Sequence, residues 1–285
     1  MRLVVRHQTI YRYANGSSRA AMLLKLTPSD NDAQRVVEWQ VSVNDEPVGP
    51  FTRNGHGDME ALWVRHDRLE AVTIVADGVI ETTDRAGVIS GMKAQPDPRV
   101  YLRETALTHP SAEMRAAADD IADDVMLDRL HLLSAEVRDR VAYRTGATES
   151  GTAAAQAFAQ GAGVCQDHAQ IFIAMARHIG VPARYVSGYL LAGEEQGALH
   201  ETHAWAEAWV AGLGWVGFDV SNGVCVTEHY VRLAAGLDAH DAAPIRGTAL
   251  ATGAITVDAD VRIAHIGDHH DHAGLVELSQ QQQQQ

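Results

Sequence analysis

Cysteine, positive charge and long apolar runs are all scarce in this sequence of 285 residues. The two cysteines, Cys165 and Cys225, are too few for a fold held together by disulfides. No stretch approaches the roughly 18 uninterrupted apolar residues of a transmembrane helix, so we expect no membrane span. Hydrophobic residues make up 46% and charged residues 21% of the chain. This composition excludes disorder throughout and is typical of one large or two modest globular domains.

The scarce positive charge argues against polyanionic partners. Lys and Arg total 23 against 37 for Asp and Glu, which gives a formal net charge of −14. Since no Lys/Arg-rich run offsets it, we expect neither nucleic acid nor an anionic membrane surface as a partner. The N-terminal residues alternate between polar and apolar and lack the charged start, apolar stretch and cleavage site of a signal peptide. We therefore expect a cytoplasmic protein whose thiols are reduced.

The chain begins with a pattern that is typical of strands. Leu3, Val5 and His7 alternate with their neighbours, and clusters of Asn, Asp and Gly separate similar runs up to about residue 82. Beyond the proline-containing segment 95–98, the period becomes helical. The sequence thus predicts an α+β protein in three parts: an antiparallel β domain over 1–95, a catalytic core over 96–267, and a polar tail over 268–285 that packs against nothing.

Within the predicted core, helices precede strands. Leu130, Leu133 and Val137 recur at helical spacing and indicate two or three helices between residues 99 and 145. We expect Ser111 to cap one helix and Thr152 to cap a short one that follows. A further helix is expected over 165–179, ended by Gly180 and Pro182. Strands are expected over 183–191, 203–210, 215–220 and 255–266.

Cys165 has the surroundings of a nucleophile. It follows two glycines and stands in the first turn of the helix predicted over 165–179. Unpaired backbone N–H groups and the helix dipole stabilise negative charge at such a position. The reactive form of cysteine is the thiolate, and a neighbouring imidazolium favours it further.

His203 and Asp219 supply the groups that such a thiolate needs. The run from His203 to Val210 alternates large and small residues like a strand, and Trp215 to Asp219 returns after a turn. A hairpin symmetric about Ala211 places His203 opposite Asp219, whereas one centred on Gly212 leaves them diagonal. In the symmetric register Asp219 accepts a hydrogen bond from one imidazole nitrogen and holds the other toward Cys165.

Four sequence blocks resemble the bacterial transglutaminase-like superfamily: Gly163-Val164-Cys165-Gln166-Asp167-His168-Ala169, Pro182-Ala183-Arg184-Tyr185-Val186-Ser187-Gly188-Tyr189, His203-Ala204-Trp205 and Gly214-Trp215-Val216-Gly217-Phe218-Asp219. The β-rich first 90 residues or so also look like the N-terminal domain of that family. The resemblance implies a papain-like core with a catalytic triad of Cys165, His203 and Asp219. Close relatives would carry Pro-Thr where this chain has Val220-Ser221.

These residues predict acyl transfer on a peptide, isopeptide or related amide. Cys165 attacks the carbonyl, His203 protonates the leaving amine, and water or another amine resolves the thioester. The backbone N–H of Cys165 is one candidate donor to the oxyanion, while Gln156 and Tyr143 are candidates for the second. The leading prediction is a cysteine peptidase or amidase without cofactor or metal. The alternative is transglutaminase-type transfer to amines, and the oligomeric state stays open.

Other interpretations of the same residues are weighed beside this one. A zinc site would use Cys165, His168, His200 and His203, although a strand would point residues 200 and 203 to opposite faces. A catalytically silent binding module would keep the fold alone. Asp167 is expected to interact with the helix N-terminus. The indoles of Trp205, Trp209 and Trp215 are expected to fill a core more than line a substrate wall, Cys225 to be a reduced thiol, and the histidines near residue 270 to lie in a polar loop.

Overall fold

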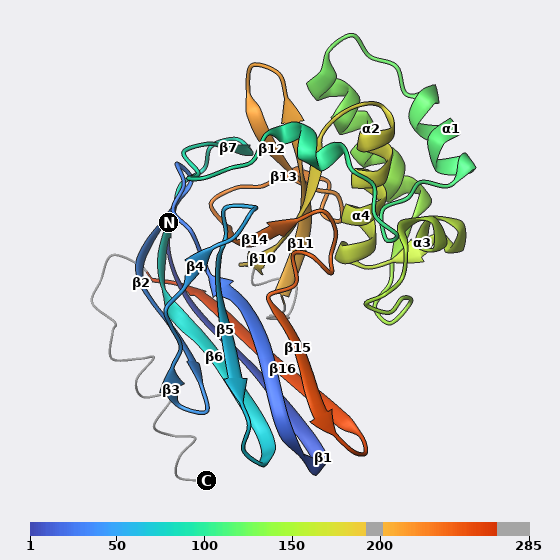
Figure 1. Cartoon of the computed structure of the whole chain (residues 1–285). Helices are drawn as coiled ribbons and strands as arrows, with labels where there is room; N and C mark the ends of the chain where they lie inside the picture. The colour runs from blue at the N-terminus through green and yellow to red at the C-terminus, as the bar shows by residue number, and fades with distance from the viewer. Residues whose placement is uncertain (192–201, 267–285) are drawn as a thin grey trace.

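The computed structural model describes residues 1–191 and 202–266. The protein is a mixed α+β fold, as the sequence predicts: a long antiparallel sheet, a group of helices and a second sheet packed on them (Figure 1). The residues predicted as a polar tail, 268–285, and His200 of the zinc alternative lie outside the described residues. Within the described ranges, no helix is long and apolar enough to cross a membrane.

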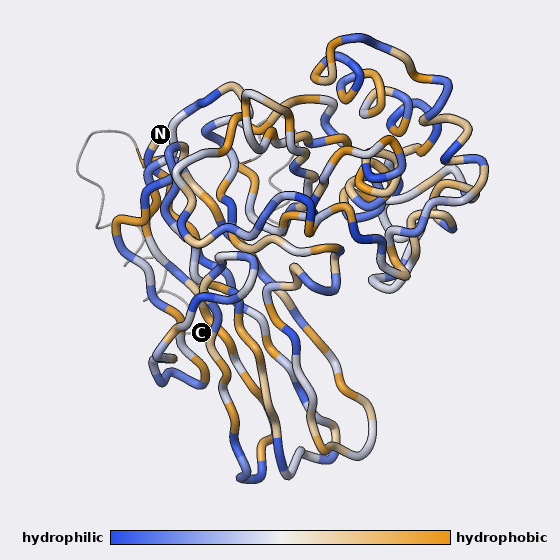
Figure 2. Tube along the Cα trace, turned by 45° about the horizontal axis from the view of Figure 1, so that its top comes forward, coloured by the Kyte–Doolittle hydropathy of each residue, from blue (hydrophilic) through white to orange (hydrophobic). Residues whose placement is uncertain are grey.

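The first sheet is built around one long strand. Its order is β3-β2-β6-β1-β5-β4, with β15 and β16 also paired to β1. Hydrophobic and hydrophilic residues alternate along these strands in Figure 2, which leaves one face of the sheet apolar. The strands are β1 (Arg2–Thr27), β2 (Gln34–Val43), β3 (Glu46–Pro47), β4 (Thr52–Arg53), β5 (Met59–Arg65), β6 (Leu69–Thr82), β15 (Ile245–Ala251) and β16 (Ile255–His265).

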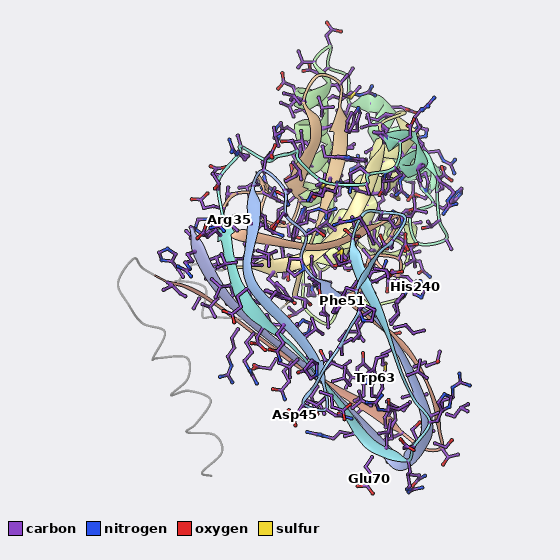
Figure 3. The ribbon with its side chains drawn as sticks, turned by 60° about the vertical axis from the view of Figure 1, so that its left-hand side comes forward. Arg35, Asp45, Phe51, Trp63, Glu70 and His240 are labelled. Atoms are coloured by element: carbon purple, nitrogen blue, oxygen red, sulfur yellow. The ribbon has the colours of Figure 1, made fainter. Side chains whose placement is uncertain are left out.

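Strand β1 changes partners halfway along its length. Its first half pairs with β6 and β16, and its second half pairs with β5 and β15. The register shifts between Arg12 and Ser17, where Gly16 has a φ of 74°. Bulges of this kind bend a strand. One strand therefore serves both halves of the sheet, whose far end in Figure 3 carries Asp45 and Glu70 while Arg35 lies near the second sheet.

The C-terminal strands differ from the division that the sequence predicts. Residues 245–265 fall inside the range predicted for the core, yet β15 and β16 hydrogen-bond to β1 in the first sheet. Leu3 pairs with His265 and Leu24 with Ile245. Strands this far apart in the sequence leave no local signal of their pairing. Alternating apolar and polar residues indicate a strand but not the strand with which it pairs.

Among the described residues, the helical segments come after β6 in the chain: η1 (Pro98–Leu102), α1 (Ala112–Asp120), α2 (Met126–Arg140), α3 (Ala154–Gln160) and α4 (Cys165–His178). Ser111 caps α1 as predicted, with its Oγ accepting from the Met114 N–H at 3.2 Å. The cap predicted at Thr152 is wrong by one residue. The N-cap residue of α3 is Ala153, which has no side-chain acceptor. The Gln156 side chain accepts from the Ala153 N–H at 3.1 Å instead.

The second sheet packs on α4. Its order is β13-β12-β11-β10-β14, with β7 (Val88–Ile89) beside β12. The strands are β10 (Ala183–Leu190), β11 (Thr202–Val210), β12 (Gly214–Asp219), β13 (Val224–Cys225) and β14 (Tyr230–Gly236). Ala204, Ala206 and Ala208 pack with the apolar side chains of α4. Since small residues let a helix approach a sheet closely, they bring the start of α4 to the edge where β11 begins. Nearby, β8 (Ala142–Tyr143) and β9 (Ala162–Gly163) form a short parallel pair.

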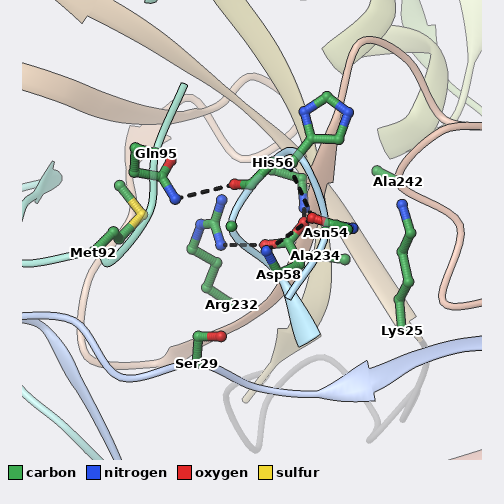
Figure 4. A network of polar contacts seen from close by, with 12 residues as sticks. Lys25, Ser29, Asn54, His56, Asp58, Met92, Gln95, Arg232, Ala234 and Ala242 are labelled. Carbon is green, nitrogen blue, oxygen red and sulfur yellow. Dashed lines mark hydrogen bonds and ion pairs between the residues drawn. The ribbon is translucent and has the colours of Figure 1, made fainter. Parts of the chain in front are cut away.

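Buried polar contacts join the two sheets. Arg232 of β14 donates to Glu207 at 3.0 Å. It also donates to Asp58, from the loop before β5, at 3.2 Å (Figure 4). His56 of the same loop contacts Asp241, after β14, at 2.8 Å. Arg232 and Glu207 both belong to the second sheet, so the contacts of Arg232 with Asp58 and of His56 with Asp241 are the ones that cross the interface. The contacts fix how the first sheet sits against the core.

Candidate active site

Cys165 is the first residue of α4 and is partly buried against the core. The start of this helix is held by Asp167, whose Oδ2 accepts from the Val164 N–H at 2.8 Å and from the Thr148 hydroxyl at 2.6 Å. This confirms the contact predicted between Asp167 and the helix N-terminus. A Cβ on Gly163 would lie 2.7 Å from the Asp167 Cβ, so glycine is required there. The first turn of α4 therefore presents its free N–H groups beside the sulfur.

His203 and Asp219 come from neighbouring antiparallel strands, but not in the symmetric register. Val210 pairs with Gly214 and Trp209 with Trp215, which centres the hairpin on Gly212. Gly212 and Gly214 have φ of 86° and 92°, conformations that favour glycine and make the turn one step longer on the β12 side. The register predicted about Ala211 is therefore wrong, and the diagonal alternative holds.

The diagonal placement still joins the two side chains. His203 Nε2 and Asp219 Oδ2 lie 2.6 Å apart. A shift of two residues in register preserves the face on which a side chain lies, which explains why the contact survives. Nδ1 is left as the ring nitrogen that can face Cys165, whose charge contributes to raising the pKa of His203. The structure thus joins His203 and Asp219 directly.

Asp219 is fully buried and accepts more hydrogen bonds than the imidazole alone supplies. Tyr230 of β14 donates its hydroxyl to Oδ2 at 2.8 Å. Asn222 donates its side-chain amide to Oδ2 at 2.6 Å and its backbone N–H to Oδ1 at 3.2 Å. With both oxygens occupied, the carboxylate is fixed in orientation as well as in charge.

These contacts set the protonation of the pair. Burial would lower the pKa of His203, but hydrogen bonds to Asp219 and Cys165, with their charges, raise it from 6.5 to about 10. Burial would raise the pKa of Asp219, yet the hydrogen bonds from His203, Tyr230 and Asn222 hold it below its usual range. At neutral pH the imidazole is therefore a cation beside the sulfur. Such a cation favours the thiolate.

Tyr230 and Asn222 are site residues that the sequence prediction missed. Tyr230 lies 11 residues after Asp219, at the start of β14, and its hydroxyl reaches the carboxylate from there. Asn222 had a local signal, since an Asx-Gly pair directly after a strand is typical of a turn that folds back on the preceding residue. The Tyr230 ring also lies 6.1 Å from the His203 ring and 5.5 Å from Trp205.

His168 is a structural histidine. Its Nε2 donates to the Val141 carbonyl at 2.8 Å, so its Nδ1 accepts from the Ser221 hydroxyl at 2.9 Å. Burial lowers its pKa, which keeps the ring neutral. Ser221, where close relatives are expected to differ, thus ties the loop after β12 to α4. Both ring nitrogens are engaged, and the described part of the chain holds no cluster of three metal-ligating side chains.

The two residues suggested as the second oxyanion donor have different surroundings. The Gln156 side chain is exposed and caps α3. The Tyr143 ring is 54% exposed and lies edge-on to His168 at 6.0 Å. The Cys165 backbone N–H at the start of α4 stays a candidate donor.

The three indoles divide between core and surface. Trp205 and Trp215 are buried, while Trp209 is 36% exposed. Trp205 stacks on His203 with the ring centroids 6.4 Å apart, so it shields one face of the imidazole.

Cys225 is a free, partly buried thiol on β13, and burial raises its pKa. Its chemistry is therefore that of an unactivated cysteine.

Comparison with known proteins agrees with this geometry. Residues 115–220 match the Transglutaminase-like superfamily, and residues 3–81 match the bacterial transglutaminase-like N-terminal region. An uncharacterized protein of Mycobacterium leprae is 29% identical over 283 residues, covering 93% of this chain and 99% of its own. Another, of Mycobacterium tuberculosis strain H37Rv, is 28% identical over 269 residues, covering 85% and 86%.

A solved structure shares the fold over nearly the whole length. It is a Cytophaga hutchinsonii protein provisionally described as a cysteine protease, with a TM-score of 0.74 and 19% identity, covering 95% of this chain and 92% of its own. At this identity the likeness concerns the fold. Together with the matched regions, it accounts for both sheets and the helices between them. The chain therefore carries a transglutaminase-like superfamily core joined to a bacterial transglutaminase-like N-terminal region.

Proposed function

We propose that this protein is a cysteine hydrolase that cleaves peptide, isopeptide or related amide bonds. The observation that carries the proposal is the buried His203–Asp219 pair at 2.6 Å, whose imidazole interacts with the Cys165 thiol. A nucleophile, a base and an orienting acid in this relation are what acyl transfer requires. The cysteine protease description of the Cytophaga hutchinsonii protein points the same way.

The reaction would proceed in two halves. The Cys165 thiolate attacks the amide carbonyl, and the new oxyanion lies toward the first-turn N–H groups of α4. As the carbon–nitrogen bond breaks, the His203 imidazolium gives its proton to the leaving amine and a thioester remains. Water then attacks the thioester while His203 takes its proton, which releases a carboxylic acid and restores the thiolate–imidazolium pair.

Asp219 has a positioning role in this scheme. It keeps Nε2 of His203 engaged, so that Nδ1 is the nitrogen exchanging protons with substrate. Since Tyr230 and Asn222 hold the carboxylate, the imidazole has one orientation through both halves of the reaction. The charge of Asp219 stabilises the imidazolium of the resting pair.

Transfer to an amine is the second candidate, and it is favoured by the match to the Transglutaminase-like superfamily. Both candidates share the thioester, and they differ in whether water or a primary amine attacks it. A hydrolase discards the acyl group as an acid, while a transferase forms a new amide. The chemistry of the triad supports the common first half equally for both.

Mass spectrometry of a peptide mixture incubated with the purified protein tests both candidates. The wild type is expected to release peptide acids, Cys165→Ala to release none, and Cys225→Ala to behave as the wild type. Adding a primary amine at millimolar concentration separates the candidates, because faster amine incorporation than hydrolysis would assign the protein as a transferase. Undiminished turnover in Cys165→Ala would reject both and leave a silent binding module as the alternative.

A further inference from the structure

Strand β16 forms a long edge of the first sheet. Among the described strands it is the longest that is hydrogen-bonded on one side alone, since β1 is its only partner (Figure 1). Its register runs without a shift from the Leu3–His265 pair to the Tyr13–Ile255 pair, and its 11 residues include no proline. Proteins usually guard a free edge with devices such as a short strand, a proline or a bulge. This edge has none of the three and is therefore open to a further strand.

The hydrogen bonds to β1 show which residues of β16 turn their backbone toward the free edge. The Ile266 N–H donates to the Arg2 carbonyl at 2.9 Å, and the Ala14 N–H donates to the Ala254 carbonyl at 3.1 Å. Successive residues of an antiparallel strand direct their backbone groups to opposite sides, so the even-numbered residues of β16 bond to β1 and the odd-numbered ones point away from it. The outward N–H and C=O groups belong to Ile255, Val257, Ala259, Val261, Ile263 and His265.

Apolar side chains remain uncovered along the same strand. Ile255 and Val257 are 48% and 54% exposed, whereas Val261 and Ile263, on the same face of the strand, are buried. The half of β16 that follows the turn from β15 thus leaves apolar surface beside the open edge. A strand added at this edge would satisfy the outward backbone groups and cover part of that surface.

The charges of β16 favour a second copy of β16 as that strand, in one antiparallel register. Its other face carries Asp258, Asp260 and Arg262, all exposed. In a symmetric pair the two-fold axis passes through one residue, because facing residues must direct their backbone groups the same way, and residues equally far on either side of it face each other. An axis at residue 258, 259 or 260 sets Asp against Asp, and an axis at 262 sets Arg against Arg. With the axis at Val261, Asp260 of each copy faces Arg262 of the other, and like charges do not meet.

We propose that this protein forms a symmetric dimer in which β16 pairs with β16 of a second copy, with the axis at Val261. Residues 256–266 then face each other, and the odd-numbered ones exchange about ten main-chain hydrogen bonds. Asp260 and Arg262 form an ion pair at 3.0 Å within one chain, and both side chains are exposed, so each can turn to its counterpart across the axis. The first sheets of the two copies become one continuous sheet. The proposal does not depend on the proposed function, because β16 contributes no residue to the triad.

Charge reversal tests this register. Sedimentation velocity over the micromolar range is expected to show wild-type monomer converting to dimer as the concentration rises. Arg262→Asp sets Asp against Asp on both sides of the axis, and Asp260→Arg sets Arg against Arg, so each is expected to weaken the dimer at least about tenfold. The double variant restores opposite charges and is expected to dimerise like the wild type, and an equimolar mixture of the two single variants is expected to form heterodimers. Arg19→Asp, the same reversal at an exposed position of β1, is the matched control. Circular dichroism checks that every variant is folded.

A backbone variant tests the edge without changing charge. Ala259 is exposed and its N–H points away from β1, so Ala259→Pro keeps the hydrogen bonds to β1 and removes one donor of each copy from the dimer. It is expected to weaken the dimer about tenfold. Hydrogen exchange should show the wild-type amides of residues 257–265 more protected at high than at low protein concentration.

Three results would overturn the proposal: a wild type that stays monomeric throughout this range, a dimer that survives Ala259→Pro unchanged, or single and double charge variants that dimerise alike. A wild-type monomer whose outward β16 amides are protected at every concentration would also reject it, because another part of the same chain would then cover the edge.

Discussion

Replacing Asp219 by Asn tests the charge relation on which the candidate site depends. The pKa of His203 is raised from 6.5 to about 10 against the opposing effect of burial. A rise of this size corresponds to ~5 kcal/mol of stabilisation of the imidazolium. Asp219 and Cys165 share this effect. If Asp219 supplies about half, its loss costs ~2 kcal/mol, which lowers the ratio of the ion pair to the neutral pair about thirtyfold.

Alkylation of the thiols by iodoacetamide measures that population. At pH 7 the wild type is expected to lose the Cys165 thiol much faster than Cys225, since burial raises the pKa of Cys225. Asp219→Asn is expected to slow the Cys165 reaction by about tenfold or more and to leave Cys225 unchanged, so Cys225 serves as an internal reference. The pH profile should also change shape, because His203 then loses its proton at lower pH.

A matched control comes from a partly buried His–Asp contact away from the triad. Asp241→Asn disturbs the contact with His56, which lies at 2.8 Å, without touching the triad. Its Cys165 alkylation rate is expected to equal that of the wild type, with circular dichroism confirming that both variants are folded. Equal Cys165 rates in Asp219→Asn and the wild type across pH 5–8 would refute the reasoning, because the carboxylate would then not support the imidazolium.

Further predictions concern packing and titration. Gly163→Ala forces a Cβ to 2.7 Å from the Asp167 Cβ, whereas Gly151 has nothing within 4 Å; we expect Gly163→Ala to lose about 1–3 kcal/mol of unfolding free energy in urea and Gly151→Ala to lose little. Burial lowers the pKa of His7 to about 4 from 6.5, so the unfolded chain binds the proton more tightly. The free energy of unfolding should therefore fall by up to ~3 kcal/mol as the pH drops from 6.5 to 4, and His7→Gln should make this fall smaller. An equal fall in the wild type and in His7→Gln would contradict the prediction. Tyr230→Phe removes a donor to Asp219, which raises the pKa of that carboxyl and lowers that of His203; the alkaline limb of the activity profile should move to lower pH, while Tyr189→Phe should leave it in place.

The sequence predicted the elements near the site better than their registers. Helix α4 begins at Cys165 as expected, because glycines before it and Gly180 after it mark both ends. The turn between β11 and β12 was placed one residue too early, since both Gly212 and Gly214 can adopt a positive φ and the sequence does not say which one sets the centre. Moving the centre of the hairpin by one residue shifts the pairing register by two residues. His203 and Asp219 therefore still lie on the same face of the sheet.

Contacts between distant segments were beyond prediction for a different reason. Tyr230 meets Asp219 although β14 and β12 are not neighbours in the sheet, and the order of strands in a sheet depends on the packing of the whole domain. An alternating run of apolar and polar residues identifies a strand but does not show which strand pairs with it. The same limit applies to β15 and β16, which were predicted as strands or core residues and form part of the first sheet.

The shared sheet has a consequence for how the polypeptide matures. Strand β1 leaves the ribosome before its partners β15 and β16, which emerge after the whole of the thiol-bearing core has been synthesised. The first sheet therefore stays incomplete until β16 has been made. A fragment cut at residue 95 would separate β1 from both of these strands and leave their hydrogen-bonding groups as exposed edges. Closing this sheet thus follows the synthesis of the core and joins segments that lie on either side of it in the sequence.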